Sequence, residues 1–372
     1  MKSRLAIDWV LVAVVVPIIG AGLLTMSSFT GGEGSFNRQI ISVCVSIAAF
    51  VFFSFGDYRF LRRTGVLVTL YGGTALLLVS LYLFGIVAKG AQSWFSLGFF
   101  SFQPSDPAKL VLILVLAKYF SKRHVEIAHW VHVIVSGLYA LVLFVLILLQ
   151  PDFGSAAIIF LIWFGMVLVS GISKKHLTVV FLSGAAVFVL LWMNVFAPYQ
   201  KQRIITFLDP LSDIRGSGYN AYQSMVAVGS GELFGKGVGF GTQSRLQFLP
   251  EYETDFIFAA FAEEWGFVGV SLLFLLFAVF FWRILRTTYY GATNFEILYG
   301  LGLCIYFMSH IVVHVGMNVG LLPVTGLTMP FMSYGGSHLL TESVGLGILM
   351  GMRRYRRAAH RDSIKNEFIG PK

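Results

Sequence analysis

Charged residues are scarce in this sequence. Asp, Glu, Lys and Arg make up only 12% of its 372 residues, whereas soluble domains carry about a quarter. Hydrophobic residues account for 57%, which is more apolar surface than a water-soluble fold of this length can bury. The shortage of charge therefore excludes a soluble protein and predicts a polytopic membrane protein.

Cysteine is also nearly missing. The only two, Cys44 and Cys304, each lie inside an apolar run, so they indicate small hydrophobic side chains in lipid rather than a disulfide or metal framework. No cytoplasmic loop carries the nucleotide-binding pattern G-x-x-x-x-G-K-[ST]. This absence disfavours an ATP-driven pump.

Long apolar runs dominate what is present. Segments of about 17 to 25 apolar residues can cross a bilayer, and here they predict ten transmembrane helices and an all-α polytopic fold. We place them at 8–28, 38–56, 65–87, 105–120, 129–149, 154–172, 176–196, 254–282, 295–317 and 336–352. We expect one membrane domain over residues 1–372, with a large loop at about 197–253 and a basic tail at about 353–372.

The basic residues predict the orientation. Most of the 27 Lys and Arg, including the run "RRYRR" at 353–357, fall on the side that holds both termini. The positive-inside rule makes this side cytoplasmic, so the net charge of +9 indicates orientation and lipid contact rather than nucleic-acid binding. Acidic residues sort to the other side, where we expect the chemistry.

The stretch "FLPEYETDFIFAAFAEEWGFVG" at 248–269 concentrates acidic residues where an apolar helix begins. Glu251 and Glu253 follow a proline and suit a helix start, where the macrodipole favours acids. Asp255 is followed directly by Phe-Ile-Phe, where hydrocarbon begins, and an Asp at the centre of a membrane helix costs roughly 2.5–3.5 kcal/mol. An acid in that position is a functional candidate, suited to general-base catalysis.

Glu263 and Glu264 lie deeper along the same predicted helix. They need partners inside the helix bundle, since unpaired carboxylates are costly there. We expect them to belong to structural pairs or a buried polar network.

The motif "QPSDPAKL" at 103–110 places Asp106 and Lys109 three residues apart, on one helix face. One interpretation is a helix cap by Ser105 or Asp106, with Lys109 extending to the membrane surface. The other is an Asp–Lys pair that faces a cavity. The sequence leaves both open.

The stretch "GLLPVTGLTMPFMSYGGSHL" at 320–339 contains glycine and proline at spacings that forbid a continuous helix. A broken segment at membrane depth must line a cavity or pack on protein, and here we expect it to line an outward-facing cavity. His310 and His314 precede it at the spacing of half a zinc site. Because no third ligand is evident, we interpret them as core or network histidines.

These motifs together resemble those of the SEDS family, the shape, elongation, division and sporulation proteins. The similarity extends over about residues 8–352 and includes the loop from Tyr199 to Ala259 and the motif "QPDFGSA" at 150–156. The segment "GKGVGFGTQ" at 235–243 and the short tails resemble RodA, the elongation member, more than FtsW. Departures are Asp106 where the family motif has Glu, His338 where it has Ser, and His314 where it has Asn.

Family membership implies ten transmembrane helices and peptidoglycan glycosyltransferase activity. Lipid II would be polymerised at the periplasmic face of the bacterial inner membrane during elongation, with undecaprenyl pyrophosphate as the leaving group. The family's essential aspartate corresponds to Asp255, the expected general base. The implied partners are a class B penicillin-binding protein, which is a transpeptidase, and the elongation proteins MreC and MreD.

Candidate substrate contacts are polar residues of the outer segments. They are Lys109, Asp106, Arg203, Gln223, Ser333 and Tyr334. Lys109 and Arg203 are suited to stabilise the pyrophosphate. The sequence shows no dedicated metal-ligand set, although a divalent cation, Mg or Mn, is compatible with the reaction. The alternative function is a flippase or transporter of a lipid-linked precursor, which would also use broken helices and intramembrane charge.

Overall fold

The fold is seen in a computed structural model of the chain. It describes residues 7–28, 33–88, 91–96, 101–122, 130–171 and 218–367, together with 178–179, 181–182, 184, 189–190, 192–194, 201–202 and 205–207. Six of the described helices are long and apolar enough to cross a membrane, and α6 is a shorter apolar helix. The chain is therefore a helical membrane protein, as the composition predicted.

Each predicted span that can be compared coincides with a described helix, although α11 is interrupted and α13 continues to Glu367, past the predicted end at 352. The described helices are α1 (Trp9–Ser27), α2 (Glu33–Ser54), α3 (Thr64–Phe84), α4 (Ser105–Ser121), α5 (Trp130–Leu148), α6 (Phe153–Val169), α9 (Tyr219–Ser230), α10 (Thr242–Arg245), α11 (Ile257–Tyr289), α12 (Asn294–Asn318) and α13 (Gly336–Glu367), with the short 3₁₀ helix η1 (Tyr58–Arg62). Most of the predicted span 176–196 lies outside the described residues, so the count of ten stays a prediction.

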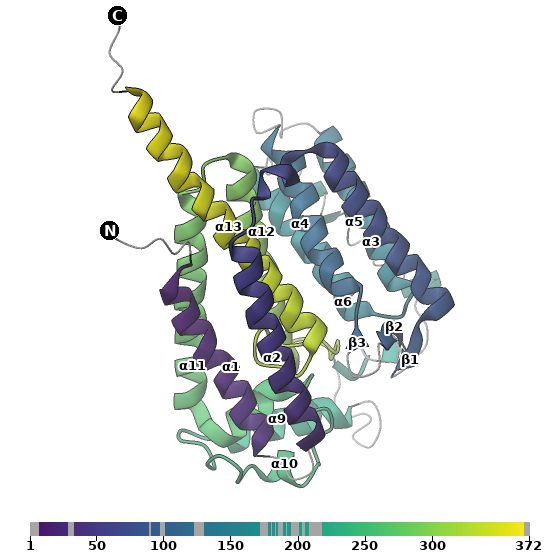
Figure 1. Cartoon of the computed structure of the whole chain (residues 1–372). Coiled ribbons are helices and arrows are strands. Elements are labelled where there is room, and N and C mark those ends of the chain that lie inside the picture. Colours follow the sequence, from purple (N-terminus) through teal and green to yellow (C-terminus); the bar gives the residue numbers. More distant parts are fainter. Residues whose placement is uncertain are drawn as a thin grey trace, which may run out of the picture.

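The segment between α3 and α4 forms a small antiparallel sheet. Its strands are β1 (Ile86–Ala88), β2 (Ala91–Ser96) and β3 (Ser101–Phe102), in the order β1-β2-β3. Figure 1 shows the sheet at the end of the molecule that also carries α9 and α10, away from the C-terminus. We call this the loop end of the molecule.

Helices far apart in the sequence pack side by side. Helix α2 lies along α13 and α1 lies along α11, while α12 contacts α4, α6 and α11 at the centre (Figure 1). Close approach depends on small residues, as in other membrane helices. A Cβ atom at Gly347 of α13 would lie only 2.7 Å from Cβ of Phe53 in α2.

The segment between α12 and α13 is not helical over residues 319–335, as its glycines and prolines predicted. We call residues 319–335 the broken segment. Phe331 in this segment has φ +61°, a left-handed conformation that is strained for a bulky residue. The surrounding contacts must therefore hold the segment in place.

Helix α11 differs from the predicted continuous span. It begins at Ile257 and is interrupted at Gly266, where φ is +63° and ψ is −167°, a conformation that is essentially restricted to glycine. The interruption frees backbone groups that must find other partners. A loop from earlier in the chain supplies them.

Residues 232–237 dock into the break in α11 through reciprocal backbone hydrogen bonds. The amides of Lys236 and Gly237 donate to the carbonyls of Glu263 and Glu264 over 2.9 and 3.0 Å. In return, the amides of Phe267 and Val268 donate to the carbonyls of Glu232 and Leu233 over 2.9 and 3.0 Å. The loop therefore replaces the missing turn of the helix, so the described part of the large loop is folded rather than a free linker.

Candidate functional site

The side chains of Glu263 and Glu264 fasten the same loop to α11. Glu263 is fully buried and accepts hydrogen bonds from Lys236 Nζ at 2.8 Å and from the amide of Gln243 at 3.0 Å. Glu264 accepts from the amide of Gly239 at 2.9 Å and from the hydroxyl of Ser28, at the end of α1. The predicted buried polar network is confirmed, and both carboxylates are engaged in holding the loop.

Asp255 lies in the turn that leads into α11. Its carboxylate approaches the broken segment at Gly326, where a Cβ atom would lie 3.5 Å from Oδ2 of Asp255. Gly326 has φ +72°, so this position favours glycine for conformational reasons as well. The carboxylate therefore faces the broken segment at Gly326, and a side chain at that position would contact it.

Asn318, the last residue of α12, holds the backbone of this turn. Its Nδ2 donates to the carbonyl of Asp255 at 3.1 Å, and its Oδ1 accepts from the amide of Ala259 at 3.1 Å. Ser224 of α9 donates its hydroxyl to the carbonyl of Asn318 at 2.9 Å. One fully buried amide thus joins α9, α11 and α12 beside Asp255.

The other side of the turn is held by the broken segment. Ser333 Oγ donates to the carbonyl of Thr254 at 2.7 Å, and the amide of Tyr334 donates to the carbonyl of Glu253 at 2.8 Å. Burial raises the pKa of the Glu253 carboxyl. Two of the predicted site residues, Ser333 and Tyr334, are therefore next to the turn of Asp255.

The two histidines before the broken segment also bind it. Nδ1 of His314 lies 2.7 Å from the carbonyl oxygen of Leu327, and Nδ1 of His310 lies 3.2 Å from that of Thr328. Both side chains are fully buried. The prediction of network histidines is confirmed.

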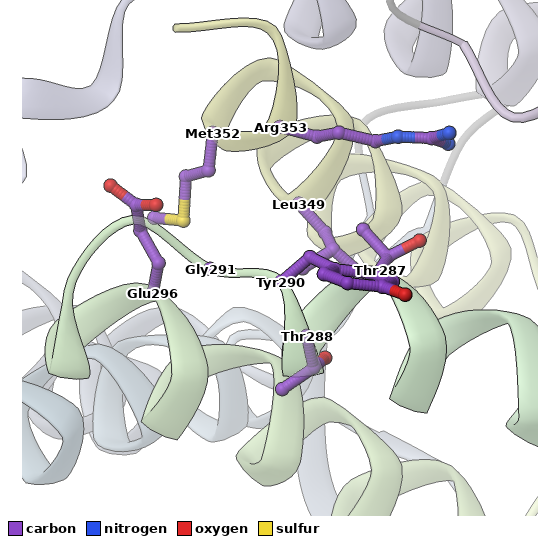
Figure 2. A pocket seen from close by; sticks show the side chains of 8 residues that line it. All are labelled: Thr287, Thr288, Tyr290, Gly291, Glu296, Leu349, Met352 and Arg353. Atoms are coloured by element: carbon purple, nitrogen blue, oxygen red, sulfur yellow. The ribbon is translucent and has the colours of Figure 1, made fainter. Parts of the chain in front are cut away.

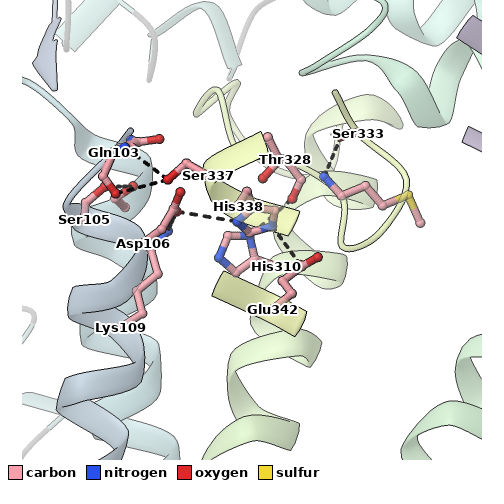
Figure 3. A network of polar contacts seen from close by, with 12 residues as sticks. Gln103, Ser105, Asp106, Lys109, His310, Thr328, Ser333, Ser337, His338 and Glu342 are labelled. Atoms are coloured by element: carbon pink, nitrogen blue, oxygen red, sulfur yellow. Dashed lines mark hydrogen bonds and ion pairs between the residues drawn. The ribbon is translucent and has the colours of Figure 1, made fainter. Parts of the chain in front are cut away.

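Asp106 and Lys109 form a buried ion pair, with Nζ 3.1 Å from Oδ1 and side chains only 3% and 2% exposed. Of the two interpretations left open, the cap is wrong, because α4 begins at Ser105 after Pro104 and no side chain caps it. Lys109 also does not extend to the surface. Figure 3 shows the pair directed from α4 toward His338 of α13.

His338 lies between two carboxylates. Its Nδ1 is 3.5 Å from Oδ1 of Asp106, and its Nε2 is 2.8 Å from Oε1 of Glu342, one turn further along α13. The second oxygen of Glu342 accepts from the amide of Phe331 at 3.0 Å. Asp106, Lys109, His338 and Glu342 are all at least nine-tenths buried; we call these four residues the charged cluster.

A surface pocket lies elsewhere (Figure 2). It is lined by Thr287, Thr288, Tyr290, Gly291, Glu296, Leu349, Met352 and Arg353. Glu296 stands near the start of α12 and Asn318 at its end, so the pocket is roughly 33 Å from the turn of Asp255 along that helix. The pocket is therefore separate from the candidate site.

The structure describes only one of the two remaining predicted site residues. Gln223 is half-buried on α9, beside Ser224, and Arg203 lies outside the described residues. Asn318, His338 and Glu342 were missed as site residues. His338 was noted only as a departure from the family motif. Its i,i+4 spacing to Glu342 is a signal that the sequence does contain, whereas nothing in the sequence pairs it with Asp106 on another helix.

Comparison with known proteins finds relatives that align over most of the chain. Peptidoglycan glycosyltransferase MrdB of Escherichia coli (strain K12) is 39% identical over 285 residues, which are 76% of each chain. Stage V sporulation protein E of Bacillus subtilis (strain 168) is 36% identical over 323 residues, 86% of this chain and 87% of the relative.

Two solved structures share the fold. The rod shape determining protein RodA of Thermus thermophilus superposes with a TM-score of 0.72 at 30% identity, covering 95% of this chain and 98% of that one. A chain from a study of the structural coordination of polymerization and crosslinking by a peptidoglycan synthase complex gives 0.81 at 32% identity, covering 94% and 98%.

A family model covers nearly the whole sequence. The model described as "Cell cycle protein", for FtsW, RodA and SpoVE, matches residues 3–358. With relatives above 30% identity over most of both chains, this match shows the family. The chain belongs to the SEDS family of peptidoglycan glycosyltransferases, the family of FtsW, RodA and SpoVE.

Proposed function

We propose that this protein polymerises lipid II into glycan strands, with Asp255 as the general base. The hydroxyl on carbon 4 of N-acetylglucosamine attacks carbon 1 of N-acetylmuramic acid on the growing strand. A carbon–oxygen bond forms there, the bond to undecaprenyl pyrophosphate breaks, and Asp255 takes the hydroxyl proton. The in-line attack inverts the configuration at carbon 1. General-base catalysis contributes about 10²–10⁴-fold to such a reaction.

The observation that carries this proposal is the position of Asp255. Its carboxylate lies against Gly326 of the broken segment, and its backbone is held on one side by Asn318 and on the other by Ser333. A general base needs a fixed position relative to the hydroxyl that it deprotonates. Glu263 and Glu264, further along α11, have a different role, because their carboxylates hold the docked loop.

The contacts of the other candidate residues indicate different roles. The hydroxyl of Ser333 is engaged with the backbone on both sides, at Thr254 and Met329, which favours a positioning role. Tyr334 is half-buried beside the turn of Asp255, and Gln223 is half-buried on α9; both are proposed substrate contacts. Lys109 and Arg203 are proposed to stabilise the leaving pyrophosphate, where a divalent cation would supply the same charge. Lys109 is buried and paired with Asp106. Its ammonium can therefore reach the pyrophosphate only if the charged cluster opens.

The cellular role that we propose is cell-wall elongation at the periplasmic face of the inner membrane. The similarity to MrdB and to the RodA structure supports elongation. The similarity to a chain of a complex that coordinates polymerization and crosslinking supports a transpeptidase partner, a class B penicillin-binding protein. We propose MreC and MreD as further partners.

The test uses the purified chain in detergent with its transpeptidase partner. With no sealed compartment, membrane potential or nucleotide, the preparation should still convert lipid II into longer glycan. The product should persist with penicillin, which blocks the transpeptidase rather than Asp255. In the same preparation, Asp255→Asn should abolish the product, because an amide keeps the shape of the side chain and cannot take the proton.

Two outcomes would overturn the proposal. Asp255→Asn activity above about a tenth of wild type would exclude a general-base role. No polymerisation in detergent, together with Asp255-dependent movement of lipid II across sealed vesicles, would favour the transporter.

A further inference from the structure

The charged cluster contains more charge than one ion pair needs. Asp106 and Glu342 contribute two carboxylates and Lys109 one ammonium, all removed from solvent. Buried charges are retained only when they are paired, since an uncompensated one is strongly destabilising. His338 stands between the two carboxylates, and as an imidazolium it would balance the cluster and donate toward both.

The cluster is also connected to the broken segment. Oε1 of Glu342 faces His338, and Oε2 accepts from the amide of Phe331. Phe331 is the residue with the strained left-handed backbone. Such a conformation persists only when its surroundings hold it, and Glu342 supplies a direct contact to its amide.

The connection continues to the turn of Asp255. Two residues after Phe331, the hydroxyl of Ser333 donates to the carbonyl of Thr254, which precedes Asp255. The ring of His338 also contacts that of His310, with centroids 4.7 Å apart, and His310 reaches the carbonyl of Thr328 in the same segment (Figure 3). Thus α4 is linked to the broken segment through the side chains of α13.

We infer that His338 and Glu342 act as a paired positioning unit, which sets the broken segment, and with it Asp255, relative to α4. The inference rests on the proposed function for its kinetic consequence. Neither residue contacts the reacting atoms in the proposed reaction. His338 fixes the orientation of the Glu342 carboxylate, and Glu342 fixes the backbone at Phe331.

The test compares His338→Gln, Glu342→Gln and the double variant. His338→Gln leaves two buried carboxylates with one ammonium, so the cluster should rearrange and kcat should fall by at least about ten-fold. In the double variant, the carboxylate of Asp106 is again balanced by the ammonium of Lys109. The side-chain amide oxygen that replaces Oε2 of Glu342 can still accept from the backbone amide of Phe331. It should recover to within about three-fold of wild type, a non-additive result.

The matched control is His132→Gln. His132 is also a buried histidine, on α5, with Nδ1 3.0 Å from the hydroxyl of Tyr119. Its replacement should change the melting temperature without changing kcat. If His338 were merely structural, its variant would behave like this control, and equal kcat values in the folded preparations would overturn the inference.

A second readout needs no substrate. Amide hydrogen exchange over residues 327–335 should be faster in His338→Gln than in wild type, restored in the double variant and unchanged in His132→Gln. Unchanged exchange in His338→Gln, or strictly additive losses in the double variant, would also overturn the inference. If wild type fails to polymerise lipid II, the proposed function falls, while exchange still decides the coupling.

Discussion

Asn318 donates its side-chain amide to the backbone carbonyl of Asp255, over 3.1 Å. The same nitrogen donates to the carbonyl of His314 at 2.7 Å. Because the carbonyl of Asp255 precedes the first residues of α11, the amide fixes the backbone from which the proposed base projects.

Replacement of Asn318 by Leu should therefore reduce polymerisation. It leaves the carbonyl of Asp255 and the amide of Ala259 without this partner, and each unpaired buried group costs about 1–3 kcal/mol. Initial rates and melting temperature measured together would show both effects. Asn194→Ala, which removes an exposed amide that donates to the carbonyl of Leu190 one helical turn earlier, is the control. Wild-type behaviour of Asn318→Leu would mean that the turn is held without it.

Lys109→Met should be more harmful than Asp106→Asn. The Met variant leaves the buried Asp106 carboxylate without its nearest cation, a change of about 3–5 kcal/mol in the free energy of unfolding. The Asn variant removes one of two carboxylates and leaves Glu342 next to His338. Unfolding and turnover assays on both variants check the order, and equal stability would contradict a buried pair.

Gly266→Ala should disrupt the docking of residues 232–237. A Cβ atom there would lie 2.2 Å from the amide nitrogen of Gly235, and the backbone conformation alone costs about 1–3 kcal/mol for alanine. We expect faster proteolysis of the loop and a lower melting temperature. Gly20→Ala in α1, where nothing lies within 4 Å, should be neutral or slightly stabilising. Similar effects of the two changes would argue against the docked loop.

Stability at acidic pH should depend on Asp8. Burial alone would raise the pKa of this carboxyl, but the hydrogen bond from Arg283 and the charge of Arg353 outweigh burial and hold the pKa below its usual value. A lowered pKa in the folded state contributes stability that is complete above the unfolded value, about 3.9, and disappears as pH falls through the folded value.

Asp8→Asn should therefore lower the melting temperature at neutral pH. The difference from wild type should shrink once the pH drops below about 4. Asp57→Asn provides the comparison, because Asp57 also binds an arginine but is 37% exposed, and exposed pairs contribute little. A difference for Asp8→Asn that stays constant down to pH about 2 would contradict the linkage.

The sequence predicted the features that depend on local composition. The lengths of the apolar runs predicted the helices, and the glycines and prolines of 320–339 predicted the broken segment. Both properties act on the backbone within a few residues. It also predicted that Glu263 and Glu264 would be paired, since a buried carboxylate is costly without a partner, whichever residue supplies it.

Features set by distant contacts could not be predicted. Gly266 and Gly269 look alike in an apolar run, yet only Gly266 breaks α11, because residues 232–237 supply the replacement hydrogen bonds. Likewise, the spacing of Asp106 and Lys109 suits both a cap and a pair, and the choice depends on His338, which the fold brings from the far end of the sequence.

The docking of residues 232–237 into α11 also imposes an order on synthesis. These residues leave the ribosome before Glu263 and Glu264, whose carbonyls they bind. Their amides must therefore stay hydrated, or pair elsewhere, until α11 has been made and inserted. Ser28, made earlier still, completes the junction by donating to Glu264. The loop end of the bundle thus closes late, and a chain arrested before residue 268 would present this loop unpaired to the translocation and quality-control machinery.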